Sequence, residues 1–193
     1  MKRIYREIWD LALKYQDVRD DKGHAEITLS FALKLLDLER VNPDVVIPAM
    51  ILHDIGWSQL PEAERFLALK RELPPETKRE IRFRHQEEGV KLAKKILDKV
   101  GYDKELSKHI LEIISQHDTR EGVFSPEDAV VRDADSLWVF SREGCVADIK
   151  RMMISEQEQL RRLEDYIDKK FFTELAINIA RNFMEKRRKE FRC

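Results

Sequence analysis

The chain has 193 residues, of which 42% are apolar and 38% are charged. No run of 18 or more apolar residues occurs, which excludes a membrane-spanning protein, and the apolar content is too high for a disordered one. The 36 basic and 37 acidic residues leave a formal net charge of -1, so the chain as a whole has no electrostatic attraction to nucleic acid or to an anionic membrane.

Cysteines and the first residues bear on the cellular compartment. Cys145 and Cys193 are far apart, so no disulfide framework is expected. The first ten residues are interrupted by charges and lack the apolar stretch of a secretory signal. We therefore expect a cytoplasmic protein.

Apolar residues repeat at helical spacing along most of the chain, and turn signals are sparse. Residues 145–193 are expected to form two helices with a break near Asp168. Before them, the pattern predicts helices over residues 2–16, 24–38, 43–57, 76–100, 103–117 and 126–141.

The third of these helices, with the sequence VVIPAMILHDIGW, is almost wholly apolar up to His53, so it should be central and buried. No long stretch alternates apolar and polar residues at the period of a strand. We predict one all-α domain over residues 1–193, with a core at about 20–142 and C-terminal helices over 143–193 packing on it. Whether those helices instead form a homodimer contact stays open.

Residues 58–80 form a charged segment directly after this helix. The segment could be a lid, but a surface helix docked by apolar side chains is the simpler interpretation. The side chains expected to dock it are Leu60, Phe66, Leu67 and Leu69.

The placement of the histidines is the most informative feature of the sequence. Four of the five lie on apolar helix faces or end an apolar segment, and each comes from a different helix. The fifth, His109, falls on the flank of its apolar stripe and should lie at the surface or boundary. The four inward-facing residues are His24, His53, His85 and His117.

A shared metal site would explain this burial. One such histidine alone is most often an ordinary core residue, but four buried imidazoles without partners would cost about 1–3 kcal/mol each. Asp54 follows His53, and Asp135 lies near the face of Trp138. We expect Asp135 to be buried and Asp133 to be solvated. Ligands of this kind, without a thiolate, suit Mn, Fe, Co, Ni, Zn or Mg.

The ordered set His24, His53-Asp54 and Asp135, all on helices, resembles the HD-domain superfamily of metal-dependent phosphohydrolases. AMILHDIGW contains the His-Asp-Ile-Gly form of its signature. HQEEGVKLA, IISQHD and ADSLW resemble later elements of the longer-signature members. The resemblance covers about residues 24–140 and implies an all-α bundle with a central metal site.

The resemblance also implies a role for each matched residue. A first divalent metal would be held by His24, His53, Asp54 and Asp135. A second would be held by His85 and His117, with Asp54 bridging the two. Whether one or two ions bind stays open. Gly89 would let the His85 helix pack closely against a neighbour.

The implied reaction is hydrolysis of a phosphomonoester or phosphodiester in a small phosphorylated substrate, which we expect to be a nucleotide. Water activated by the metal would attack phosphorus in line, with Asp54, His85 and His117 as the catalytic residues. Cations close to these residues in sequence are candidates for binding the substrate phosphate. They are Lys22, Arg84, Arg120 and Arg132.

Two departures from the family pattern limit the substrate. Many relatives have a lysine after the His-Asp-x-Gly element, where this chain has Trp57. Trp57 would wall the pocket, stack on a base or belong to the core. The Gly-Tyr-Pro loop of the cyclic-dinucleotide branch is missing after His117, so that activity is not assigned.

Two other classes of function stay open. Diiron oxygenases that resemble myo-inositol oxygenase use the same ordered ligands, and a metal-stabilised regulatory domain would need no catalysis. Residues 181–193 contain six basic and two acidic residues. This tail is too short and too poor in aromatic residues to indicate nucleic-acid binding.

Overall fold

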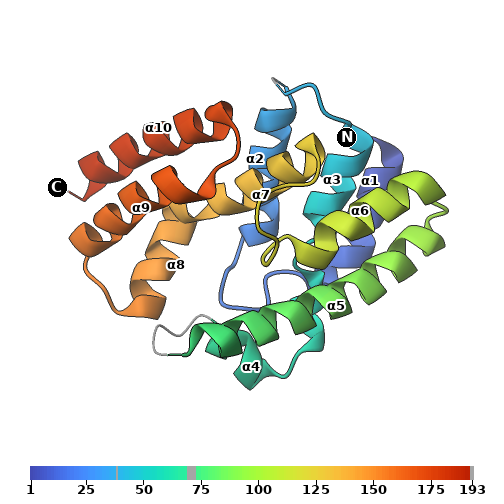
Figure 1. The fold of residues 1–193 in the computed structure, drawn as a ribbon, viewed down its shortest axis with the longest axis horizontal. Coiled ribbons are helices and arrows are strands. Elements are labelled where there is room, and N and C mark those ends of the chain that lie inside the picture. The colour runs from blue at the N-terminus through green and yellow to red at the C-terminus, as the bar shows by residue number, and fades with distance from the viewer. Residues whose placement is uncertain (38, 69–72, 192–193) are drawn as a thin grey trace.

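The computed structural model describes residues 1–37, 39–68 and 73–191. These residues form helices joined by short turns and include no strand, so the all-α prediction is confirmed (Figure 1). Three short 3₁₀ helices accompany the α-helices; they are η1 (Leu13–Tyr15), η2 (Ile55–Gln59) and η3 (Leu137–Phe140). The α-helices are α1 (Arg3–Ala12), α2 (His24–Leu36), α3 (Pro43–Leu52), α4 (Glu62–Leu67), α5 (Pro75–Lys99), α6 (Lys104–Gln116), α7 (Pro126–Ser136), α8 (Arg142–Met152), α9 (Glu156–Lys170) and α10 (Glu174–Glu190).

Helix α3 lies at the centre of the fold, as predicted. Every residue from Val45 to Leu52 is buried, and α3 packs against α1, α2, α6 and α7. The helix begins at a capped turn, where the side-chain oxygen of Asn42 accepts the backbone N–H of Asp44 at 2.9 Å. Pro43 occupies the first turn, where its missing N–H costs nothing.

The chain turns at His53 and Asp54 directly after α3 and continues as η2, which packs along α5. Gly56 permits this approach, because a Cβ there would lie 1.9 Å from the backbone oxygen of His85. A Cβ at Gly89 would meet only ordinary contacts, the nearest being 3.4 Å from Ile114. The family resemblance implied that Gly89 lets the His85 helix pack closely against its neighbour. In the structure, the residue that this close packing requires to be glycine is mainly Gly56.

The 58–80 segment contains α4. Leu60 and Ala68 are buried in a small cluster with Trp57, and Leu67 packs against that cluster. Phe66 is 37% exposed, so the prediction that it docks the segment was wrong. Leu69 lies outside the described residues, as does Leu38. A lid function for this segment stays a prediction.

Three helices follow η3, where the sequence predicted two. The break expected near Asp168 lies at residues 171–173, and a second break follows α8 at Met153, which has a left-handed φ of 50°. Helices α9 and α10 lie side by side at one edge of the molecule, and α10 packs on η3 (Figure 1). The division into a core at 20–142 and a packing C-terminal part stays a prediction.

The ends of α1 also differ from the expectation. The helix predicted over residues 2–16 ends at Ala12 and continues as η1, where Leu13 is 56% exposed. None of the described helices has the length and apolar character that crossing a membrane requires.

Candidate metal centre

The six predicted ligands lie at helix ends or on inward helix faces, and the fold brings all of them together. His24 begins α2, His53 and Asp54 follow α3, and His117 follows α6. His85 lies within α5 and Asp135 in the last turn of α7. All four histidines are buried, as predicted. His109 is partly exposed and contacts Ser125, which confirms its boundary position.

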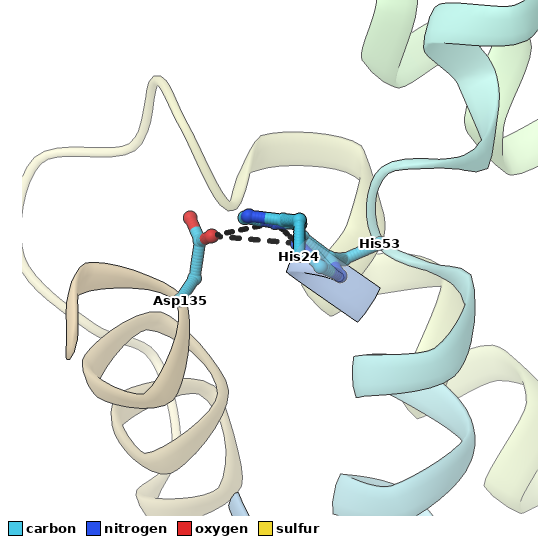
Figure 2. A group of neighbouring side chains, drawn as sticks. All are labelled: His24, His53 and Asp135. Carbon is cyan, nitrogen blue, oxygen red and sulfur yellow. Dashed lines mark hydrogen bonds and ion pairs between the residues drawn. The ribbon is translucent and has the colours of Figure 1, made fainter. Parts of the chain in front are cut away.

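His24, His53 and Asp135 form one group of potential ligands (Figure 2). The Nε2 atoms of His24 and His53 are 3.3 Å apart. Oδ1 of Asp135 lies 3.3 Å from Nε2 of His24 and 3.5 Å from Nε2 of His53. Figure 2 shows the carboxylate of Asp135 facing both rings from the neighbouring helix.

Asp54, His85 and His117 form a second group. Oδ1 of Asp54 lies 3.6 Å from Nε2 of His85 and 3.4 Å from Nε2 of His117. Its other oxygen, Oδ2, lies 3.4 Å from Nε2 of His24 and 3.7 Å from Nε2 of His53. The two oxygens of one carboxylate therefore face the two groups.

Hydrogen bonds to backbone carbonyls orient two of the rings. Nδ1 of His53 lies 2.8 Å from the oxygen of Met50, and Nδ1 of His117 lies 2.9 Å from that of Ile114. A carbonyl can only accept, so each Nδ1 donates, and in the neutral ring Nε2 keeps its lone pair for a ligand bond.

The donor set fits divalent metal ions. Two ligand atoms about 2.0–2.1 Å from one ion would be about 2.9–3.4 Å apart, close to the separations within each group. Among the described residues, Nε2 of both His85 and His117 is buried without a hydrogen-bond partner. A metal would satisfy these atoms. Imidazole and carboxylate ligands without thiolate favour Mn, Fe, Co, Ni, Zn or Mg.

The electrostatics of the site follow from its mixed charges. Burial opposes a charge on His53, but Asp54 and Asp135 outweigh it and raise its pKa to about 9. Burial lowers the pKa of His85. Burial also works against the charge of Asp54, yet Arg19 and His53 hold its pKa well below the usual range. The carboxylate of Asp54 therefore stays ionised at neutral pH and can bind a cation.

Arg19 is a cation of the site that sequence reasoning missed. Its Nη2 lies 2.7 Å from Oδ2 of Asp54, and its Nε lies 3.3 Å from Oδ2 of Asp21. The guanidinium also lies over the ring of Trp57 at 4.3 Å. Arg19 and Lys22 are both close to His24 in sequence, and only the turn between them determines that Arg19 points inward.

Trp57 supports the second group of ligands. Its ring stacks on His85 with centroids 3.9 Å apart, and its Nε1 donates to Oδ1 of Asp54 at 3.1 Å. The residue is only 1% exposed, so it offers no open face to a substrate base. Of the three roles considered for Trp57, the structure favours a buried wall that orients His85 and Asp54.

Asp118 also faces the centre, and the sequence analysis did not select it. Its Oδ2 lies 3.7 Å from Nε2 of His85 and 4.0 Å from Nε2 of His117. The available signal was a second His-Asp pair, since Asp118 directly follows His117. Asp118 lines two cavities that adjoin the metal centre.

Three of the four cations proposed for substrate binding lie away from these cavities. Lys22 is exposed, Arg84 pairs with Glu64 at 2.7 Å, and Arg120 pairs with Glu112. Their role in substrate binding stays a prediction without geometric support. Arg132 does line a cavity next to the centre.

The expected exposure of Asp133 was wrong. The residue is fully buried, and its carboxylate accepts the backbone N–H groups of Phe172 and Thr173, each at 2.9 Å. It also accepts the hydroxyl of Thr173 at 2.7 Å. A contact with residues 39 and 40 positions away could not be read from the pattern of α7. Asp135 is instead partly exposed, with 28% of its side chain accessible.

The chain is similar to known proteins in its sequence and in its fold. Residues 22–138 match the model of the family described as HD domain. No curated protein matches the chain. Among solved structures, the crystal structure of a predicted HD superfamily hydrolase from an uncultured Thermotogales bacterium has a TM-score of 0.64 and 21% identity. The match covers 97% of this chain and 88% of that chain, so the shared fold includes the helices after residue 138.

Proposed function

The chain belongs to the HD-domain family, and on that premise we propose that it is a metal-dependent phosphohydrolase. Its substrate would be a small phosphomonoester or phosphodiester, with a nucleotide as the expected class. The observation that carries the proposal is the position of Asp54, whose two carboxylate oxygens face two separate groups of buried ligands.

Each group of ligands has a defined task in this proposal. His24, His53 and Asp135 would hold one divalent ion, His85 and His117 a second, and Asp54 would bridge them. When bound, the ions supply an activated water and positive charge opposite the phosphoryl oxygens. Trp57 and the carbonyls of Met50 and Ile114 keep the rings aligned for this purpose.

Asp118 is the acid best placed to take a proton from the attacking water. It lines both cavities, whereas Asp54 has its oxygens directed at ligand groups and Arg19. Burial works to raise the pKa of Asp118, but His117 and Arg82 outweigh it and hold the pKa below its usual value. The carboxylate is therefore ionised and able to accept a proton at neutral pH.

The test combines metal content with turnover on a panel of phosphoesters. We expect about two divalent ions per chain and release of phosphate or a phosphomonoester with Mn²⁺ or another divalent ion. Asp54→Asn should abolish turnover and lower the metal content. His109→Gln is the matched control, because His109 lies outside both groups, and it should keep both.

The same panel separates the hydrolase from its alternatives. Two bound irons with turnover that consumes oxygen would replace the hydrolase with a diiron oxygenase. Full metal content without turnover of any phosphoester would favour a metal-stabilised regulatory domain. Failure to take up any metal would contradict all three.

A further inference from the structure

Two of the larger cavities lined by described residues adjoin the candidate metal centre and share part of their lining. The lysine cavity, defined by Arg82, Arg132, Tyr166, Lys169, Lys170 and Phe172 with Asp118 and Asp135, has a volume of about 380 Å³. The arginine cavity lies beside Arg19, Trp57, Trp138, Arg151 and Arg162 and has about 250 Å³. Arg82, Asp118, Asp135 and Tyr166 line both.

The two cavities differ in charge. The arginine cavity is lined by four arginines and five aspartates. Two of these arginines are paired, because Arg19 lies 2.7 Å from Asp54 and Arg151 lies 3.7 Å from Asp148. The lysine cavity has four cations and two aspartates. Both of those aspartates, Asp118 and Asp135, are directed at the metal centre.

The excess charge of the lysine cavity is therefore open to an anion. Within the described part of the chain, no ion pair joins Lys169 or Lys170 to an acid, whereas the charge of Arg82 acts on Asp118. Arg132 is fixed in place, because it donates to the backbone oxygens of Gly122 and Arg120. Its guanidinium also lies 4.7 Å from the ring of Phe172.

The wall that carries the two lysines is held to the metal-binding helix. Lys169 and Lys170 end α9, and the next turn is bound at Phe172 and Thr173 by the buried carboxylate of Asp133 in α7. Asp135, a candidate ligand, lies two residues further along α7. Asp133 therefore links the turn that follows the two lysines to the helix that contains the candidate ligand Asp135.

We propose that the lysine cavity binds a second anionic group of the substrate, a phosphate or carboxylate, while the scissile phosphoester lies at the metal centre. The assignment rests on the proposed phosphohydrolase function and narrows it to substrates with at least two anionic groups. Helix α9, which lies outside the matched residues 22–138, then determines selectivity through Lys169 and Lys170.

The test measures binding and turnover separately. Calorimetry on the full-length protein in excess Mn²⁺ compares propane-1,3-diphosphonate, a non-hydrolysable probe with two phosphonates, with propylphosphonate, which has one. We expect tighter binding of the diphosphonate. The double variant Lys169→Ala/Lys170→Ala should weaken it about tenfold, as the removal of two exposed charge contacts implies, and change propylphosphonate less than about twofold.

A matched pair of lysines provides the control. Lys94→Ala/Lys95→Ala removes the same charge from an exposed face of α5 and should leave both probes unchanged. In turnover, the Lys169/Lys170 variant should raise KM for nucleoside di- and triphosphates. The effect should shrink in high salt, because exposed charges are screened.

Equal weakening of both probes, or an effect of equal size from the α5 control, would show general electrostatics and overturn the cavity assignment. No effect of the Lys169/Lys170 variant would leave those lysines as ordinary partners of the α9 C-terminus and also overturn it. If no phosphoester is hydrolysed but the two probes still differ in the expected way, the proposed reaction fails while the anion site stands.

Discussion

At the scale of single residues, Gly56 should be the least replaceable position next to the metal centre. A Cβ there would lie 1.9 Å from the oxygen of His85 and 2.4 Å from the nitrogen of Gly89, both backbone atoms that cannot move aside. Gly56→Ala should lower the unfolding free energy by about 3 kcal/mol or more, at the upper end of overpacking. Thermal unfolding of the purified variant measures this loss.

Gly89→Ala is the matched comparison for that substitution. The added Cβ meets the side chain of Ile114 at 3.4 Å and Gly56 at 3.7 Å, which are ordinary contacts. The cost should stay below about 1.5 kcal/mol. Equal losses in the two variants would contradict the view that η2, rather than α5, lacks space for a side chain.

The raised pKa of His53 predicts how the affinity for metal depends on pH. In the metal-free protein its pKa is raised from 6.5 to about 9, so protonated His53 stabilises this form fully below pH 6.5, and the effect is lost as pH rises through 9. A metal must displace that proton. Affinity for Mn²⁺ should therefore increase between pH 6.5 and 8.5, by at most about tenfold per unit for one proton.

Titration of Mn²⁺ at three pH values within this range tests the slope. His109→Gln should retain it, because His109 belongs to neither ligand group. An affinity that does not change with pH would show that His53 is already neutral in the metal-free protein.

At the scale of elements, Asp133 connects α7 to the turn between α9 and α10. Asp133→Ala would leave two backbone N–H groups and the hydroxyl of Thr173 without their acceptor. We expect the free energy of unfolding to fall by about 2–3 kcal/mol, because buried donors that lose a charged acceptor are left unpaired. Urea unfolding measures it, with Glu143→Ala, an exposed acid of α8, expected to change the stability by less than 0.5 kcal/mol.

The helix boundaries illustrate what local patterns can predict. The helix predicted to begin at residue 126 does begin at Pro126, and Ser125 caps it by accepting the N–H of Asp128 at 3.1 Å. The number of C-terminal helices was wrong, because the break at Met153 depends on a left-handed φ in a residue that carries no turn signal. Breaks without glycine or proline are decided by packing.

At the scale of the whole molecule, the metal centre joins five helices or their ends. The ligands come from α2, the end of α3, α5, the end of α6, and α7, so only the folded chain can assemble them. Metal should therefore stabilise the fold, by about 2.7 kcal/mol at a concentration one hundred times Kd. Removal by EDTA should lower Tm, and Mn²⁺ should restore it.

His85→Ala is the control variant for the effect of metal on Tm. The variant removes one ligand of the second group, so Mn²⁺ should raise its Tm less than that of the unmodified chain. An unmodified chain whose Tm does not respond to EDTA or Mn²⁺ would show that the buried histidines are ordinary core residues.

The amino-acid sequence by itself determined the helical class, the central position of α3 and the inward direction of His24, His53, His85 and His117. Those features are local, because the spacing of residues along a helix sets the face on which each side chain lies. The order of the His and Asp motifs was sufficient to indicate the family.

Only the tertiary structure decided which cations and acids surround the centre. Arg19 and Asp118 lie in turns beside it, and the packing of α9 places Lys169 in the lining of an adjoining cavity. Asp133 is buried by a segment some 40 residues away. Helical spacing carries no information about such contacts, because the direction of a side chain in a turn and the approach of distant segments depend on the packed fold.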